Sequence, residues 1–235
     1  MTARRLLITR RAATVVIAAN VFKPNIKALA TAQGWDGYGN VDVVINSGVY
    51  VVALEIIDMP HDVVTITNNG IIGGTIHSDG TGMYIRNRIR VINNGTIFGC
   101  GGTGGVGSSV SVCWGGACHS ASGGDGGIGA GFYTTNSWAT VLYRATGLPG
   151  VAGQNDHRPS SGYPGDSGSD IVGGTGGTGG SIGVAGSPGG DAQAYGSYDY
   201  YNATVAGSGA PAGYYINGNS FVTWLVNGSR YGRVI

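Results

Sequence analysis

The feature that most constrains this chain is a period of three among its glycines. Between Gly173 and Gly190 the sequence reads GGTGGTGGSIGVAGSPGG, with a glycine at every third position from Gly174 onward. Neither the 3.6-residue period of an α-helix nor the two-residue alternation of a strand matches this spacing. The polyproline II helix does, with three residues per turn and a rise of about 3.1 Å. The stretch predicts either one extended helix of roughly 55 Å or a helix that folds back near residues 181–188.

Glycine suits this conformation for a backbone reason. A polyproline II helix makes no internal hydrogen bonds, so its N–H and C=O groups need partners elsewhere. Because glycine has no Cβ, two such backbones can approach closely enough to bond to each other. The sequence therefore predicts a bundle of polyglycine II helices in which each helix donates to and accepts from its neighbours.

Two other glycine-rich states need to be weighed. Collagen requires an uninterrupted glycine period and abundant proline, whereas this period breaks repeatedly and the chain has seven prolines. Disorder is the stronger alternative, because 47 of the 235 residues are glycine. We favour order, since 13 tyrosines, 4 tryptophans and 42% hydrophobic residues are unlike a solvated disordered segment.

The glycine-rich part covers residues 99–213, where glycine runs alternate with glycine-poorer segments. The runs are Gly101–Gly107, Gly123–Gly131, Gly147–Gly153, Gly162–Gly168 and Gly173–Gly190, with a weaker one at Gly207–Gly213. The segments between them carry most aromatic and reactive side chains of this part. Straight rods joined by loops place those loops at the two ends of the bundle, where a rigid scaffold displays them.

Residues 1–39 precede the β-like part and are expected to attach the chain to its assembly. We expect a strand at Thr14–Ala19 and a short helix that opens at Pro24 and ends at Gly34, since proline and glycine punctuate helices in this way. A signal peptide is the lesser interpretation of the arginines and apolar residues at the start.

Residues 40–98 are rich in β-branched and apolar residues between turn signals, which predicts a β-rich domain. Two of its segments resemble each other, and their Asn-Asn-Gly triplets begin at Asn68 and Asn93. A repeat of this length indicates stacked, solenoid-like turns, although Asn-Gly also marks tight hairpins.

Residues 214–235 form a predicted C-terminal β segment with two strands around Asn227 and Gly228. In residues 221–226 both alternating faces are largely apolar. This pattern predicts a strand that is buried on both sides or lies at a subunit contact.

Charge, hydropathy and cysteine spacing exclude several classes of protein. The formal net charge is +1 and only 11% of the residues are charged, which gives no case for a nucleic-acid partner. No apolar run approaches the ~20 residues of a membrane-spanning helix. The chain has no Cys-x-x-Cys pair for zinc. One Gly-x-Gly-x-x-Gly match, residues 102–107, is a chance event at this glycine content, so no cofactor is expected.

No residue pattern supports catalysis, and we expect a protein that is not an enzyme. Asp156 and His157 offer acid and base types in a polar turn, where a solvated surface role is the usual one. Cys113 and Cys118 could close a small disulfide loop or remain free thiols. A thiol–imidazole pair with His119 is disfavoured, because sequence neighbours seldom have the required geometry.

At this point the chain resembles a known family. Ile45–Val49, Val64–Ile72, the array Gly101–Gly190 and Ile216–Trp224 look like the glycine-rich tail-tip and tail-fibre proteins of bacteriophages. The array is similar to the receptor-binding adhesin that caps the long tail fibres of some T-even-type phages. The resemblance covers most of residues 40–235 and implies a sandwich of polyglycine helices whose variable loops contact the bacterial surface. The first 35 residues depart from it.

The aromatic residues of the loops are the expected receptor contacts, because large rigid side chains provide binding area at low entropic cost. They could instead cap the bundle against water. The candidates are Trp114, His119, Trp138, Tyr143, His157, Arg158, Tyr195, Tyr198, Tyr200 and Tyr201.

The combined expectation is a mostly β chain with a polyglycine II bundle that acts in the virion, at the tail tip or fibre. Its partners would be a host outer-membrane protein or polysaccharide and, through the N-terminal part, other tail proteins. A homotrimer would match the usual symmetry of fibres. The alternatives are a structural virion component without receptor contact and an exported glycine-rich bacterial surface protein.

Overall fold

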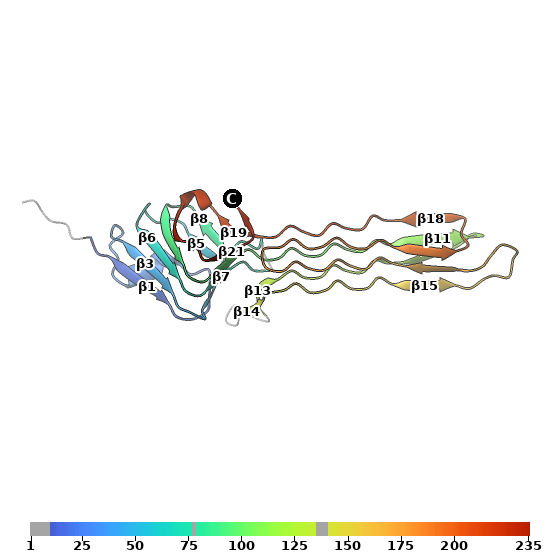
Figure 1. Ribbon diagram of the computed structural model, residues 1–235, viewed down its shortest axis with the longest axis horizontal. Helices are drawn as coiled ribbons and strands as arrows, with labels where there is room; N and C mark the ends of the chain where they lie inside the picture. Colours follow the sequence, from blue (N-terminus) through green and yellow to red (C-terminus); the bar gives the residue numbers. More distant parts are fainter. Residues whose placement is uncertain (1–9, 77–78, 135–140) are drawn as a thin grey trace, which may run out of the picture.

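The chain forms a β-rich unit at one end and a long glycine-rich rod that ends in small sheets (Figure 1). The computed structural model describes residues 10–76, 79–134 and 141–235. The C-terminus lies in the β-rich unit, so the chain runs out along the rod and returns.

Three ladders of parallel strands build the β-rich unit. The first contains, in order, β1 (Ala13–Ile17), β3 (Val41–Ile45), β6 (Val64–Asn68), β9 (Ile89–Asn93) and β20 (Val222–Val226). The second contains β2 (Val21–Phe22), β4 (Tyr50–Val52), β7 (Ile71–Gly73), β10 (Thr96–Phe98) and β21 (Ser229–Tyr231). The third contains β5 (Leu54–Ile56), β8 (Met83–Ile85), β19 (Tyr214–Asn217) and β22 (Arg233–Val234). Successive passes of the chain therefore lie on one another.

The register of these ladders explains why apolar and polar residues alternate in the sequence. Val43 pairs with Ile66, and Ile66 pairs with Val91, so identical faces of consecutive strands point inward. All three side chains are fully buried, and the apolar positions between polar ones form the core of the unit. The strands are therefore held by burial of β-branched side chains as well as by backbone pairing.

Strand β20 departs from the expectation of burial on both sides. Thr223 is exposed and Leu225 is 53% exposed, while Val222 and Trp224 are half-buried. The reason is position, because β20 is the last strand of the first ladder and only one of its edges is paired. The segments on either side of Asn227-Gly228 also enter different ladders, since β20 pairs with β9 and β21 with β10.

The helix α1 (Ile26–Ala32) packs against β1. It begins two residues later than Pro24, because the side chain of Asn25 caps it by accepting a hydrogen bond from the N–H of Ala28 at 2.9 Å. The buried side chains of Ile26 and Ala30 fix its inner face. Among the described residues, no helix has the length and apolar character to cross a bilayer.

The rod is an insertion into the β-rich unit. The chain leaves after β10, and when it returns as β19 it pairs with β8. The points of departure and return are neighbours, because the N–H of Gly213 donates to the C=O of Cys100 at 2.8 Å. The last 22 residues then extend all three ladders, so residues 214–235 stack directly on residues 83–98.

Extended segments run back and forth along the rod and bond to each other at every third residue. The N–H of Gly104 donates to Gly127 at 2.8 Å, and the N–H of Gly107 donates to Gly124 at 2.9 Å. The same spacing recurs between the other segments of the described chain. These segments are residues 101–107, 123–130, 148–154, 173–180, 184–190 and 205–213. These hydrogen bonds join backbone groups to backbone groups, so the backbone itself holds the rod together.

For the run Gly173–Gly190 the structure shows the fold-back, one of the two predicted alternatives, and for the run Gly162–Gly168 it differs from the prediction of a rod. The run Gly173–Gly190 is not one rod, because it folds back where the N–H of Val184 donates to the C=O of Ser181 at 2.9 Å. The run Gly162–Gly168 is not a rod segment either. Gly162, Gly165 and Gly168 have φ values of 80°, 85° and 77°, which turn the chain rather than extend it.

Small antiparallel sheets close the two ends of the rod. At the far end, β11 (Val110–Trp114), β12 (Ala117–Ala121) and β18 (Tyr200–Ala203) form one sheet. A second sheet there contains β15 (Asn155–Arg158), β16 (Ser169–Val172) and β17 (Gln193–Gly196). The hairpin β13 (Gly131–Thr134) and β14 (Val141–Arg144) lies at the near end, beside the β-rich unit (Figure 1).

Candidate functional site at the far end of the rod

The far end of the rod, which we call the distal tip, consists of residues 109–122, 155–172 and 192–204. Its two sheets pack on each other through a small apolar core that includes Val110, Val112 and Ile171. The remaining side chains are mainly polar or aromatic. The tip therefore has enough core to keep its shape, while most of its surface is free for contact.

A chain of polar contacts joins the two sheets. In His119, Nδ1 lies 3.0 Å from Oδ2 of Asp156, and Nε2 lies 2.9 Å from Oγ of Ser169. This order of groups is that of a serine hydrolase triad. Ser169, however, is only 3% exposed and lies in the central strand β16, so a substrate cannot reach its hydroxyl. The chain of contacts fastens the sheets together and does not present a nucleophile.

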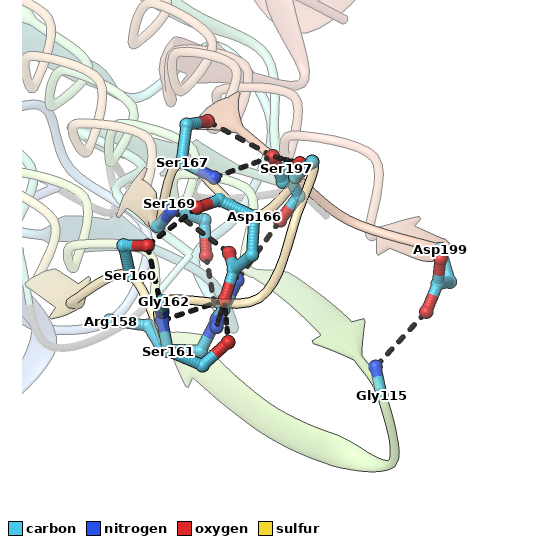
Figure 2. A network of polar contacts seen from close by, with 12 residues as sticks. Gly115, Arg158, Ser160, Ser161, Gly162, Asp166, Ser167, Ser169, Ser197 and Asp199 are labelled. Atoms are coloured by element: carbon cyan, nitrogen blue, oxygen red, sulfur yellow. Dashed lines mark hydrogen bonds and ion pairs between the residues drawn. The ribbon is translucent and has the colours of Figure 1, made fainter.

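A buried carboxylate organises the loop at residues 159–168 (Figure 2). Asp166 has no side-chain exposure and forms two contacts with Arg158, from Nη2 to Oδ1 at 2.7 Å and from Nη1 to Oδ2 at 3.0 Å. It also accepts hydrogen bonds from the backbone N–H of Ser161 at 2.8 Å and of Gly168 at 2.9 Å. The guanidinium of Arg158 holds the pKa of Asp166 well below its usual range, and the Ser161 hydroxyl is the second largest cause of this shift.

A disulfide closes the tip of the β11–β12 hairpin. Cys113 and Cys118 are bonded across the two strands, with 4.0 Å between their Cα atoms. Asp199 ties this hairpin to the neighbouring segment, because its N–H donates to the C=O of Cys113 and its carboxylate accepts from the N–H of Gly115 at 3.0 Å. The position of the segment that leads into β18 therefore depends on the hairpin.

That segment carries a cluster of exposed tyrosines. Tyr198 and Tyr201 are in contact, with 5.8 Å between ring centroids. Tyr200 is exposed in β18 next to Tyr201 in sequence, and Tyr195 is exposed in β17 of the second tip sheet. Tyr163 is the most exposed tyrosine of the described tip, at 74%. The sequence analysis did not single out Tyr163. Its position between Gly162 and Pro164, inside a serine- and glycine-rich turn, was the available signal.

The structure brings most of the expected contact residues to the distal tip. Trp114 is half-buried at the hairpin, and His157 is exposed beside Asp170. His119 and Arg158 are also in the tip, where both are engaged in the polar contacts that hold it together.

One expected contact residue lies elsewhere, and another is not among the described residues. Tyr143 lies in β14 at the near end, where its ring packs 5.5 Å from that of Phe98 and 5.7 Å from that of Phe132. Trp138 lies outside the described residues. Within residues 10–76, 79–134 and 141–235, no cluster of His, Cys, Asp or Glu side chains could hold a metal ion.

Comparisons with known proteins bear on this architecture. No curated protein matches the chain. Among solved structures, the crystal structure of the gp37–gp38 adhesin tip complex of the bacteriophage S16 long tail fibre contains a similar chain. The TM-score is 0.49 and the sequence identity 19%, over 96% of this chain and 83% of that chain. Residues 12–235 match the family described as phage tail fibre adhesin Gp38. The chain therefore belongs to the Gp38 family of phage tail fibre adhesins, the receptor-binding proteins that a virion carries on its tail fibre.

Proposed function

We propose that this adhesin contacts the host cell through its distal tip and attaches to the fibre through its β-rich unit. The observation that carries the proposal is the distribution of exposed aromatic side chains. Tyr195, Tyr198, Tyr200 and Tyr201 gather at one end of the molecule, at the opposite end of the rod from the ladders that hold both described ends of the chain. Tyrosine clusters of this kind are typical of binding loops.

The rod and the β-rich unit serve this display as scaffolds. We infer that the rod segments are polyglycine II helices, because their backbone hydrogen bonds recur at every third residue and no side chain separates them. We infer likewise that the three parallel ladders are the faces of a short β-solenoid. Backbone pairing holds the rod, and a buried apolar core adds to backbone pairing in the β-rich unit, so the loop sequences can vary without loss of the fold.

The proposed receptor contacts are a subset of the residues expected from the sequence. They are Trp114, His157, Tyr195, Tyr198, Tyr200 and Tyr201, all of which the structure places in the tip. Tyr143 is omitted because its ring packs at the near end of the rod. We assign His119 and Arg158 to the framework of the tip, and the role proposed for the whole tip is binding without catalysis. The receptor would be an outer-membrane protein or a polysaccharide of the host.

Binding of labelled protein to host cells tests this proposal. Deletion of residues 192–206 would remove strands from both tip sheets, so point variants are more informative. We expect the variant with Tyr198→Ala, Tyr200→Ala and Tyr201→Ala to fold normally and to lose saturable binding. Tyr38→Ala is the control, because Tyr38 is also an exposed tyrosine but lies in the β-rich unit. A folded triple variant that binds like the unchanged protein would contradict the proposal.

A further inference from the structure

The largest hollow described on the distal tip lies between two of its loops. It has a volume of about 460 Å³ and is lined by Trp114, Gly115, Ala117, Arg158, Ser161 and Tyr163. Trp114 to Ala117 belong to the disulfide-closed hairpin, whereas Arg158 to Tyr163 belong to the loop that Asp166 organises. Figure 2 shows Gly115 at the turn of the hairpin and Ser161 and Gly162 in the loop. Two further hollows on the tip measure about 260 and 170 Å³.

The walls of this hollow are aromatic and polar rather than aliphatic. Ala117 contributes its only aliphatic side chain, and the two large side chains, Trp114 and Tyr163, are aromatic. An aromatic face carries partial negative charge, which attracts the partly positive C–H groups of a sugar ring. A pyranose presents such C–H groups on one face and hydroxyls around its edge.

The net charge of the hollow also limits which ligands it can bind. Arg158 is the one charged residue that lines it, and the carboxylate of Asp166 neutralises this guanidinium. A free phosphate or carboxylate would therefore find no net positive charge here. An uncharged ligand loses nothing by this neutrality, because it has no need of a counter-charge.

Two polar groups of the hollow remain able to bind hydroxyls. The Ser161 hydroxyl donates to Asp166, which leaves its oxygen lone pairs free to accept. Arg158 has five N–H donors, and the described residues accept from Nε, from Nη2 twice and from Nη1 once. One hydrogen on Nη1 is therefore available. Asp166 already holds both side chains in place. Binding a sugar hydroxyl between them therefore costs little additional side-chain entropy.

We propose that this hollow binds a neutral pyranose unit of a polysaccharide on the host surface. The ring lies against Trp114 or Tyr163, and its hydroxyls accept from Arg158 and donate to Ser161. This inference rests on the proposed function of the tip and names the chemical class of ligand that one part of the tip takes. It also gives Tyr163, which lies outside the tyrosine cluster, a role in specificity.

Calorimetric titration of the adhesin with lipid-free polysaccharide from host lipopolysaccharide tests the proposal. We expect saturable binding that is unchanged between about 0.05 and 0.5 M salt, because a neutral ligand is not screened. Tyr163→Ala should weaken this binding at least about tenfold, as the loss of a central aromatic contact does. Tyr163 is highly exposed in a surface loop, so the variant should fold. Tyr38→Ala is the matched control, since Tyr38 is similarly exposed, at 68% against 74% for Tyr163, but lies in the β-rich unit away from the hollow.

A second titration separates this inference from the proposed function. Outer-membrane protein from the same host is reconstituted in vesicles without polysaccharide. Binding of these vesicles is measured for the unchanged adhesin and for the Tyr163→Ala variant. If the unchanged adhesin binds cells and these vesicles but not the polysaccharide, the tip is an adhesin for protein and the pyranose site is wrong. Equal polysaccharide binding by Tyr163→Ala and the unchanged protein would also overturn it. Loss of cell binding in the triple tyrosine variant, with polysaccharide binding retained, supports two separate contact sites.

Discussion

Asn68 and Asn93 are hydrogen-bonded to each other inside the β-rich unit, with Nδ2 of Asn68 donating to Oδ1 of Asn93 at 2.8 Å. Both side chains are fully buried and occupy equivalent positions in adjacent strands. Asn93 also donates from Nδ2 to the C=O of Asn227 at 2.9 Å, and Asn68 accepts from the N–H of Gly70. The pair therefore satisfies backbone groups at the corner between two ladders and connects the C-terminal strands to the rest of the unit.

Replacement of Asn93 by alanine should destabilise the β-rich unit. The change removes the acceptor of one N–H of the buried Asn68 amide, which keeps only its longer bond to the C=O of Thr96 at 3.3 Å, and a buried donor left unsatisfied costs about 1–3 kcal/mol. Denaturant unfolding would measure the difference. Asn94→Ala is the control, because the Asn94 side chain makes an exposed contact with Asn69 and should contribute less than about 0.5 kcal/mol. Equal midpoints for the two variants would contradict this account of the pair.

The rod should distinguish between glycines of the same run, Gly173–Gly190. A Cβ on Gly177 would lie 2.1 Å from the C=O oxygen of Ser187, whereas on Gly190 the nearest atoms, of Thr175, lie at 3.5 Å. Because a backbone contact cannot move aside, Gly177→Ala should cost about 1–3 kcal/mol or prevent soluble expression. Gly190→Ala should have a midpoint within a degree or two of the unchanged protein. Thermal unfolding compares them, and similar midpoints would argue against tight packing of backbones.

The three cysteines should differ in reactivity. Burial raises the pKa of the Cys100 thiol to about 11, so this residue is present as the unreactive thiol at neutral pH. We expect no alkylation of the native protein by iodoacetamide and two modified residues, Cys113 and Cys118, after mild reduction. Intact-mass measurement gives the count, and alkylation of Cys100 in the native protein would contradict its placement.

Reduction of the disulfide should weaken host binding without unfolding the rod. The hairpin that it closes positions Asp199 and lines the hollow with Trp114. The double variant Cys113→Ser, Cys118→Ser should therefore bind host cells several-fold more weakly, with an unchanged main unfolding transition. Cys100→Ala serves as the control for loss of a cysteine outside the tip. Undiminished binding by the double variant would show that the hairpin holds its shape without the bond.

Acid should release the loop at residues 159–168. Arg158 holds the pKa of Asp166 well below its usual range in the folded protein, whereas an unfolded aspartate has a pKa of about 3.9. The stabilisation is therefore present above about pH 4 and is lost as the pH falls below that value toward the folded pKa. Limited proteolysis between pH 3 and 7 should show cleavage in this loop increasing below about pH 4.

Asp166→Asn should make the same loop susceptible to proteolysis at neutral pH, because it removes the charge that pairs with Arg158. Asp125→Asn, at an exposed position in the rod, is the control and should leave the cleavage profile unchanged. A loop that is cut equally at pH 3 and pH 7 in the unchanged protein would show that the ion pair does not secure it.

The period of three predicted glycine-rich rods joined by loops, because it matches neither an α-helix nor a strand and favours extended segments that pair through their backbones. It could not show which loops share an end. Each rod reverses the direction of the chain, so successive loops alternate between the two ends, and the segment with Tyr143 falls beside Phe98 rather than with the other aromatic residues. Counting reversals from residue 99 assigns the loop with Tyr143 to the near end, and the fold-back near residues 181–188, one of two alternatives in the sequence, returns residues 192–206 to the far end.

Other features depend on contacts between distant parts of the chain. The pairing of β19 with β8 joins residues that are more than 100 positions apart, and no local pattern in Tyr214–Asn217 specifies that partner. The Asn-Asn-Gly repeat did indicate that strands stack at one corner of the unit. The repeated asparagines, Asn68 and Asn93, lie opposite each other in the paired strands β6 and β9. The ion pair of Arg158 and Asp166 could not be foreseen, since both residues look like ordinary polar loop residues in the sequence.

The insertion of the rod between β10 and β19 has a consequence for how host range can change. Only two peptide crossings, at Cys100 and Gly213, connect residues 101–212 to the β-rich unit, and they lie side by side. Recombination at these two points would exchange the rod and its distal tip as one block between phages, and with them the receptor contacts that we propose for the tip. The strands that flank the block would keep their registers, so a virus could acquire a new host while its fibre remained unaltered.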